Sequence, residues 1–175
     1  MKVAVVIGHH EKAKGAFSEH LGKSEYDFYS DVVKSLTNVS IFTHDPNIRG
    51  YTNRIKNTAK KLNEQEFDLV MELHFNSAVP QAHGCETLYY FNSENGKHYA
   101  KLFSEVVNEC TGIKLRNGGL KALVNKNDRG YASVYYPKAP TILIEPFFGS
   151  NKGDCEKIRS AENVASLINE FLEDL

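Results

Sequence analysis

The sequence has no excess of charge of either sign. It carries 21 lysines and arginines against 22 aspartates and glutamates, which gives a formal net charge of −1 with neutral histidines. The lysines are scattered along the chain, whereas nucleic-acid-binding domains and polybasic membrane-binding segments concentrate them in runs or patches. We therefore expect neither nucleic acid nor an anionic membrane surface as a partner.

The sequence also lacks a long apolar run. No stretch approaches the roughly 20 apolar residues that a transmembrane helix needs. The apolar start at residues 1–7 is too short for the core of a signal peptide followed by a cleavage site. These absences predict a protein that is made in the cytoplasm without a signal peptide and has no stable membrane association.

Cysteine is scarce, with only Cys85, Cys110 and Cys155. Their odd number, their wide spacing and the absence of a C-x-x-C pair speak against a disulfide framework and against a thiolate zinc site. We expect these cysteines to be small buried hydrophobic side chains. A G-x-G-x-x-G motif and a P-loop are also absent after the first predicted strand, so nothing in the sequence favours nucleotide binding.

Apolar runs typical of strands alternate with segments whose apolar residues recur at helical spacing. Predicted strands cover residues 2–7, 39–43, 67–75, 85–91 and 141–144, and predicted helices cover 24–36, 52–65, 99–110 and 158–172. This alternation is typical of an α/β fold, here a three-layer, mostly parallel twisted sheet with helices on both faces. The 175 residues suffice for one hydrophobic core, so we expect a single domain over 1–175. Residues 113–138 show poor periodicity and predict a long, partly ordered and functional loop region with one short strand at about 120–124.

Titratable side chains stand where three predicted strands end. His9 follows the first strand, His74 closes the run 67–75, and Glu145 follows the last strand. The carboxyl ends of parallel strands lie on one edge of the sheet, so these residues can converge. Glu25, at the start of the next helix, begins from the same edge. Two histidines, one carboxylate and an open position form the ligand set of a catalytic zinc site, and a second carboxylate can act as general base.

Each of these residues also has a plainer interpretation. A lone histidine such as His74 is more often a hydrogen-bonded core residue. An acid in the first turn of a helix, such as Glu25, complements the helix dipole. Adjacent side chains point in opposite directions from an extended backbone, so only one of His9 and His10 can face the site. Glu19 is a second candidate acid in the loop that precedes the helix.

The order of these motifs resembles the zinc-dependent N-acetylmuramoyl-L-alanine amidases of the Amidase_3 type. The matching segments are Val-Val-Ile-Gly8-His9, Glu25-Tyr-Asp, Leu73-His74-Phe-Asn76 and Pro140-Thr-Ile-Leu-Ile-Glu145-Pro-Phe-Phe-Gly-Ser-Asn151, and they extend over nearly the whole chain. The resemblance implies one zinc ion held by His9, Glu25 and His74, with Glu145 as the catalytic carboxylate. It leaves His10 and Glu19 as rival ligands.

For three further residues the sequence leaves the role open or predicts no role in the site. Asn76 can bind substrate or stabilise a turn. Glu72 alternates onto the His74 side of its strand, where it can hydrogen-bond a metal ligand or simply be buried and paired. His44, like most remaining histidines, lies in a polar stretch and is predicted to be at the surface.

The resemblance implies hydrolysis of the amide that joins the lactyl group of N-acetylmuramic acid to L-alanine of the wall peptide. The expected partner is peptidoglycan, and we expect a monomer with no separate wall-binding module. The expected setting is a phage endolysin, or an autolysin exported by another route, that reaches the wall after synthesis in the cytoplasm. Two alternatives are another zinc peptidase, such as a carboxypeptidase with positioned arginines, and a non-catalytic wall-binding domain.

Overall fold

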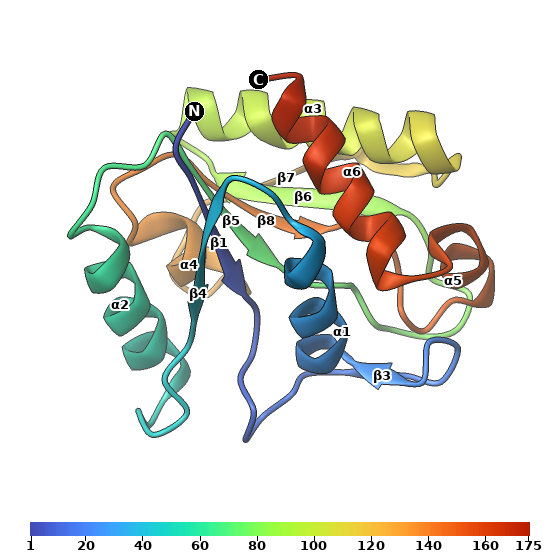
Figure 1. Ribbon diagram of the computed structural model, residues 1–175, viewed down its shortest axis with the longest axis horizontal. Helices are drawn as coiled ribbons and strands as arrows, with labels where there is room; N and C mark the ends of the chain where they lie inside the picture. Colours follow the sequence, from blue (N-terminus) through green and yellow to red (C-terminus); the bar gives the residue numbers. More distant parts are fainter.

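A six-stranded mixed sheet organises the protein, and the computed structural model describes all of residues 1–175 (Figure 1). The strands lie in the order β4-β1-β5-β8-β6-β7. Their bounds are β1 Val3–Ile7, β4 Val39–Thr43, β5 Leu69–Leu73, β6 Cys85–Tyr90, β7 Leu115–Leu123 and β8 Thr141–Glu145. Strands β4, β1, β5 and β8 are parallel, whereas β6 runs antiparallel to β8 and parallel to β7. The prediction of a mostly parallel sheet is confirmed.

Helices cover both faces of this sheet (Figure 1). The bounds are α1 Glu25–Val32, η1 Val33–Ser35, α2 Tyr51–Leu62, α3 Glu94–Thr111, α4 Tyr131–Tyr135, α5 Lys152–Ile158 and α6 Ala161–Glu173. Side chains of β1 and β5 alternate between the two faces. Val5 and Met71 join the main core with α1, α3 and α6, whereas Val6 packs with Leu62 of α2 on the other face. The three-layer prediction is therefore confirmed.

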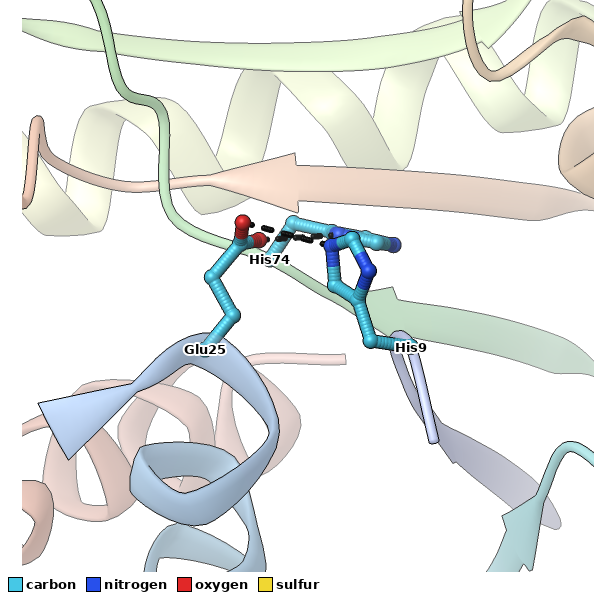
Figure 2. Close-up of side chains that lie close together, drawn as sticks. All are labelled: His9, Glu25 and His74. Atoms are coloured by element: carbon cyan, nitrogen blue, oxygen red, sulfur yellow. Dashed lines mark hydrogen bonds and ion pairs between the residues drawn. The ribbon is translucent and has the colours of Figure 1, made fainter. Parts of the chain in front are cut away.

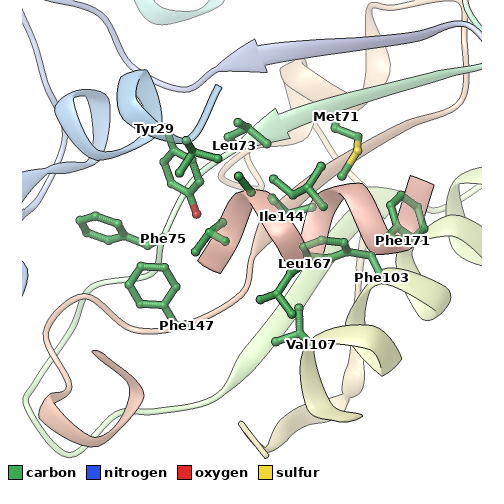
Figure 3. Close-up of a cluster of buried hydrophobic side chains, with 14 of the residues drawn as sticks. Tyr29, Met71, Leu73, Phe75, Phe103, Val107, Ile144, Phe147, Leu167 and Phe171 are labelled. Carbon is green, nitrogen blue, oxygen red and sulfur yellow. The ribbon is translucent and has the colours of Figure 1, made fainter. Parts of the chain in front are cut away.

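The main core contains 28 buried residues and lies between the sheet and helices α1, α3 and α6. Figure 3 shows Tyr29, Phe75 and Phe147 gathered at one end of it, close to where β5 and β8 finish. The Tyr29 hydroxyl donates a hydrogen bond to the backbone carbonyl of His74 at 2.6 Å. Close-packed interiors resist displacement, so this aromatic group gives the end of β5 a rigid support.

The structure departs from the sequence prediction in three segments. Residues 113–138, expected as a long loop region with one short strand at about 120–124, contain the nine-residue strand β7, which already begins at Leu115, and the short helix α4. The first part of the strand escaped prediction because it includes Asn117, Gly118 and Gly119 at positive φ, which breaks its alternation. The last predicted helix is divided into α5 and α6 at Arg159, which has φ 67°. Finally, Cys110 is exposed, whereas Cys85 and Cys155 are buried as expected.

A short antiparallel hairpin, formed by β2 (Phe17–Ser18) and β3 (Lys23–Ser24), leads into α1. The Ser24 side chain caps α1 by accepting a hydrogen bond from the Asp27 N–H, so Glu25 becomes the first helical residue. No helix of the protein has both the length and the apolar character needed to cross a membrane.

Candidate metal centre and active site

The ends of three parallel strands bring the predicted site residues together. His9 lies two residues beyond β1, His74 follows β5 directly, and Glu145 is the last residue of β8. In the sheet β1 pairs with β5 and β5 pairs with β8, so the three strand ends are neighbours. Glu25 enters the same space from the start of α1. Three strand ends and the start of α1 therefore bring these four side chains to one edge of the sheet.

His9, Glu25 and His74 form a compact cluster (Figure 2). Glu25 lies between the two rings, with Oε1 3.2 Å from His9 Nε2 and Oε2 3.1 Å from His74 Nδ1. One donor atom from each residue lies within 4.8 Å of the other two. His9 Nε2 is buried and has no hydrogen-bond partner. Imidazole and carboxylate donors are ligands that a divalent ion such as zinc accepts, so the cluster fits a metal ion.

Two features of the backbone allow the imidazole rings of His9 and His74 to lie close together. His9 adopts the left-handed conformation, with φ 66°, which redirects the chain at the end of β1. Gly8 passes against β5, where its N–H donates to the Leu73 carbonyl at 3.1 Å. A Cβ at position 8 would lie 2.4 Å from the Leu73 oxygen and 2.5 Å from His74 Cε1. A side chain larger than glycine cannot occupy this position without moving His74.

We expect Gly8→Ala to destabilise the protein by about 1–3 kcal/mol or more, as overpacking in a rigid region does. It should also weaken metal binding, because the clash is with the His74 ring. Gly153→Ala is the matched control, since a Cβ there meets only Asn151 Oδ1 at 3.4 Å. Urea denaturation and zinc titration of both variants measure the two effects. A Gly8→Ala protein with wild-type stability and zinc affinity would contradict this account.

The second ring nitrogen of His74 is held by Glu72. His74 Nε2 lies 3.0 Å from Glu72 Oε1, and the Ser133 hydroxyl donates to the same oxygen at 3.0 Å. His44 Nε2 is 3.7 Å from Glu72 Oε1, and His44 Nδ1 is 2.8 Å from Thr58 Oγ1. His44 is therefore buried rather than at the surface as predicted, because it belongs to this polar network beneath the site.

Opposite charges dominate the electrostatics of the cluster. Burial alone would lower the pKa of His74, but its hydrogen bonds to Glu25 and Glu72 outweigh this and raise the pKa to about 10. Burial would raise the pKa of Glu25, but its hydrogen bond to His74 and the adjacent His9 imidazole hold it well below its usual range. In the metal-free protein the site therefore holds a proton on His74, between two ionised carboxylates. A metal ion can replace this positive charge.

Glu145 lies in a different environment. Burial raises the pKa of Glu145 to about 7, and the nearby Glu86 carboxylate acts in the same direction, whereas the positive charge of His74 opposes the rise. The side-chain amide of Asn76 donates to Glu145 Oε2 at 2.9 Å and to Glu86 Oε1 at 2.8 Å. A carboxylate with a pKa near neutrality can both accept and return a proton.

Sequence reasoning did not identify Glu86 as a site residue. Glu86 stands opposite Glu145 in the antiparallel pairing of β6 with β8. It lies 3.6 Å from Arg116 Nε, and the Arg116 guanidinium stacks 4.8 Å from the centre of the Phe148 ring. No local pattern in residues 85–91 indicates this pairing, since only the register between the two strands creates it.

A single cavity of about 430 Å³ connects these groups. Its lining includes His9 and His74 of the three-residue cluster together with Asn76 and Glu145. Cavities of this size accommodate small molecules or short peptide segments. The site thus combines a cluster that fits a metal ion, a carboxylate with a pKa of about 7 and space for a small molecule or short peptide.

The sequence model of one protein family, described as N-acetylmuramoyl-L-alanine amidase (Amidase_3), matches residues 3–174. The chain belongs to this amidase family.

Solved amidase structures share the fold over nearly the whole chain. The catalytic domain of the CD27L endolysin targeting Clostridia Difficile has a TM-score of 0.77 and 24% identity, covering 99% of this chain and 97% of that one. The CwlD amidase from Clostridioides difficile, in complex with the GerS lipoprotein, has a TM-score of 0.78 and 17% identity, covering 99% and 96%. The amidase AmiC2 of Nostoc punctiforme has a TM-score of 0.75 and 19% identity, again covering 99% and 96%. These TM-scores show a common fold.

One curated relative is the uncharacterized protein YqiI of Bacillus subtilis (strain 168). It is 29% identical over 104 residues, which cover 58% of this chain and 47% of the relative. The match therefore spans about half the length of that protein.

The geometry of this amidase-family chain separates the candidate ligands that the sequence left open. His9 is in the three-residue cluster, whereas His10 is not. His10 is buried, and neither of its ring nitrogens has a hydrogen-bond partner. Glu25 is 2% exposed inside the site, but Glu19 is exposed to solvent within the hairpin. Asn76, predicted to bind substrate or to stabilise a turn, hydrogen-bonds Glu145 and lines the cavity.

Replacing Glu72 with glutamine should lower metal affinity by roughly 10–100-fold, the usual cost of removing the partner that orients a ligating histidine. The amide keeps the shape of the side chain but loses the charge that fixes the His74 ring. Zinc competition with a chromophoric chelator measures the change. The exposed Glu66→Gln serves as control. Unchanged affinity in Glu72→Gln would show that Glu72 is only a buried, paired residue.

Proposed function

We propose that this chain is a zinc-dependent peptidoglycan amidase, which hydrolyses the amide between the lactyl group of N-acetylmuramic acid and L-alanine. The observation that carries the proposal is the convergence of His9, Glu25 and His74 at one end of a cavity that Glu145 also lines. Membership of the amidase family supports the choice of substrate.

The residues that would hold zinc are His9 through Nε2, His74 through Nδ1 and Glu25 through its carboxylate, because these atoms face one another. Three protein ligands leave a position free for water or substrate, as in catalytic sites. A zinc ion held there would supply Lewis-acid chemistry, which would polarise the amide carbonyl and lower the pKa of water to ~7. Glu72 keeps His74 in the orientation that presents Nδ1 to the site.

Glu145 supplies the proton transfers. As a carboxylate it accepts a proton from the attacking water, and as a carboxylic acid it donates that proton to the nitrogen of L-alanine when the C–N bond breaks. The products are the free lactyl carboxylate and a peptide with a new amino terminus. Asn76 fixes the Glu145 carboxylate through its 2.9 Å hydrogen bond, so that the carboxylate points into the cavity throughout.

The raised pKa of Glu145 also makes the stability of the protein depend on pH. Its pKa is about 7 in the folded protein against an ordinary 4.5, so between these values the folded state holds a proton that the unfolded state releases. The free energy of unfolding should therefore fall as pH rises from about 4.5 to 7.

We accordingly expect metal-free Glu145→Gln protein to be more stable than wild type at pH 8, by about 2–3 kcal/mol, and to match it near pH 4. Urea denaturation of both metal-free proteins across this pH range measures the difference. The comparison cancels contributions from the other titrating groups. A constant difference across the range would mean that burial does not raise the pKa of Glu145.

Mass spectrometry of digested peptidoglycan tests the function directly. Metal-loaded protein should release peptides with a new amino-terminal alanine, and a chelator should abolish this release. Cleavage at the carboxyl end of the peptide would instead support the carboxypeptidase alternative. Tight zinc binding without any cleavage would support a non-catalytic wall-binding domain.

The proposal extends to how the enzyme reaches its substrate. We propose a monomer without stable membrane association, which acts on the wall after release from the cytoplasm in the manner of an endolysin. Sedimentation of the purified protein tests the monomeric state. Fractionation of producing cells before and after membrane permeabilisation tests the route.

A further inference from the structure

The cavity has a cationic end. Lys121 on β7 and two residues of the loop between β7 and α4, Lys126 and Arg129, line the same cavity as Glu145. All three are exposed, and none forms an ion pair with a protein carboxylate. Lysines elsewhere on the surface, such as Lys14 and Lys23, do pair with aspartates. These three positive charges around one cavity are therefore available to an anionic ligand.

Asp128 is the one acidic residue that lines the cavity near these cations, and its carboxylate is hydrogen-bonded within its own loop. The Asp128 carboxylate accepts hydrogen bonds from the N–H groups of Val124 and Asn125 at 2.7 and 2.9 Å, and from the Asn125 side chain at 3.2 Å. These backbone hydrogen bonds lower the pKa of Asp128, so it stays ionised and keeps the loop closed on itself. One anion against three cations leaves the loop end of the cavity positively charged.

These charges lie close enough to act on the reacting end. The positive charges of Lys121 and Arg129 both oppose the burial-driven rise in the pKa of Glu145. The same cavity is also lined by His9 and His74 of the three-residue cluster. The cavity therefore joins the candidate metal cluster to a cationic rim.

We infer that the cationic rim formed by Lys121, Lys126 and Arg129 binds a free carboxylate of the wall peptide and makes the enzyme selective for acidic over amidated peptides. The inference rests on the proposed function, because it assumes that the peptide occupies this cavity. The second residue of the wall peptide is a glutamate joined through its γ-carboxyl group, so its α-carboxylate is free unless it is amidated. It lies two residues from the scissile amide, and at ~3.8 Å per residue both fit within one cavity.

The chemistry of the rim suits this ligand. A guanidinium offers paired N–H donors that match a carboxylate, and the lysines add point charges that need no fixed geometry. A carboxamide of the same shape gains neither interaction. Binding the carboxylate at the rim would also direct the other end of the peptide toward Glu145 and the metal cluster.

Two muramyl tripeptides that differ only in this group test the inference. One carries D-glutamate with a free α-carboxylate and the other carries the α-carboxamide. Calorimetric titration into zinc-loaded Glu145→Gln protein measures binding without cleavage. We expect the acidic peptide to bind at least tenfold more tightly, and we expect added salt to reduce the difference. Lys121→Gln combined with Arg129→Gln should remove the preference, whereas Lys97→Gln on α3, outside the cavity, should retain it.

The outcomes separate the inference from the proposed function. Equal binding of both peptides, or a preference that survives the double substitution, would overturn the inference whatever the enzyme cleaves. A preference that the double substitution removes supports it even if wild-type protein fails to cleave at L-alanine, which would count against the function alone. Failure of both peptides to bind would contradict both.

Discussion

Glu145→Gln protein should cleave peptidoglycan about 10²–10⁴-fold more slowly than wild type while it keeps its fold and its zinc, because a glutamine cannot accept a proton from water. The substitution preserves the size of the side chain, and the Asn76 amide can still donate to the remaining carbonyl oxygen in place of the 2.9 Å hydrogen bond to Oε2. The loss should appear in kcat, since the residue acts on the reacting atoms.

Release of amino-terminal alanine from a defined muramyl peptide measures this rate. Glu109→Gln on α3, an exposed glutamate outside the cavity, is the control. Zinc content and thermal unfolding are measured on the same preparations, so that a loss of metal is not mistaken for a loss of the base. If Glu145→Gln retained activity within a few-fold of wild type, the general base would have to be another group.

His9→Ala protein should lose zinc affinity by more than ~100-fold and lose activity with it, whereas its neighbour His10→Ala should retain both. His9 contributes a buried ring nitrogen with no hydrogen-bond partner to the three-residue cluster, and His10 lies outside that cluster. Removing one of three ligands costs more than the 10–100-fold that removing an orienting partner costs. Glu25→Gln and Glu19→Gln form a second pair with the same expected contrast.

Equilibrium competition with a chelator measures the affinities, and activity with added zinc shows whether excess metal restores function. His10 is buried, so His10→Gln accompanies His10→Ala in case the smaller residue leaves a destabilising cavity. Zinc retained by His9→Ala but lost from both His10 variants would transfer the ligand role to His10 and overturn the proposed metal set.

Local patterns in the sequence were sufficient to predict which side chains converge at the candidate site. The apolar runs that became β1, β5 and β8 predicted parallel strands, and parallel strands place their carboxyl ends on one edge. His9, His74 and Glu145 stand at those ends, so their convergence followed without knowledge of side-chain packing. Ser24 marked the start of α1 and thus the position of Glu25.

The choice between adjacent candidates required backbone geometry. Alternation along an extended chain predicts that His9 and His10 diverge, but it does not say which one faces the site. The φ of 66° at His9 decides this, and the close approach of Gly8 to β5 brings the two rings together. Such conformations depend on contacts with a neighbouring strand, so they are not readable from residue type alone.

The surroundings of the site were decided by tertiary structure alone. Glu86 meets Asn76 and Glu145 only because β6 pairs antiparallel with β8 at that register. His44 is buried because it follows β4 directly and contacts both Thr58 of α2 and Glu72. Lys121 reaches the cavity because β7 pairs with β6 at the edge of the sheet. Periodicity reports which face of an element is buried, whereas the partner across that face is chosen by strand register and by packing between elements distant in sequence. For that reason the sequence determined the fold class and the edge of the sheet that carries the candidate site, and the tertiary structure decided which side chains surround the cluster and which of them line the cavity.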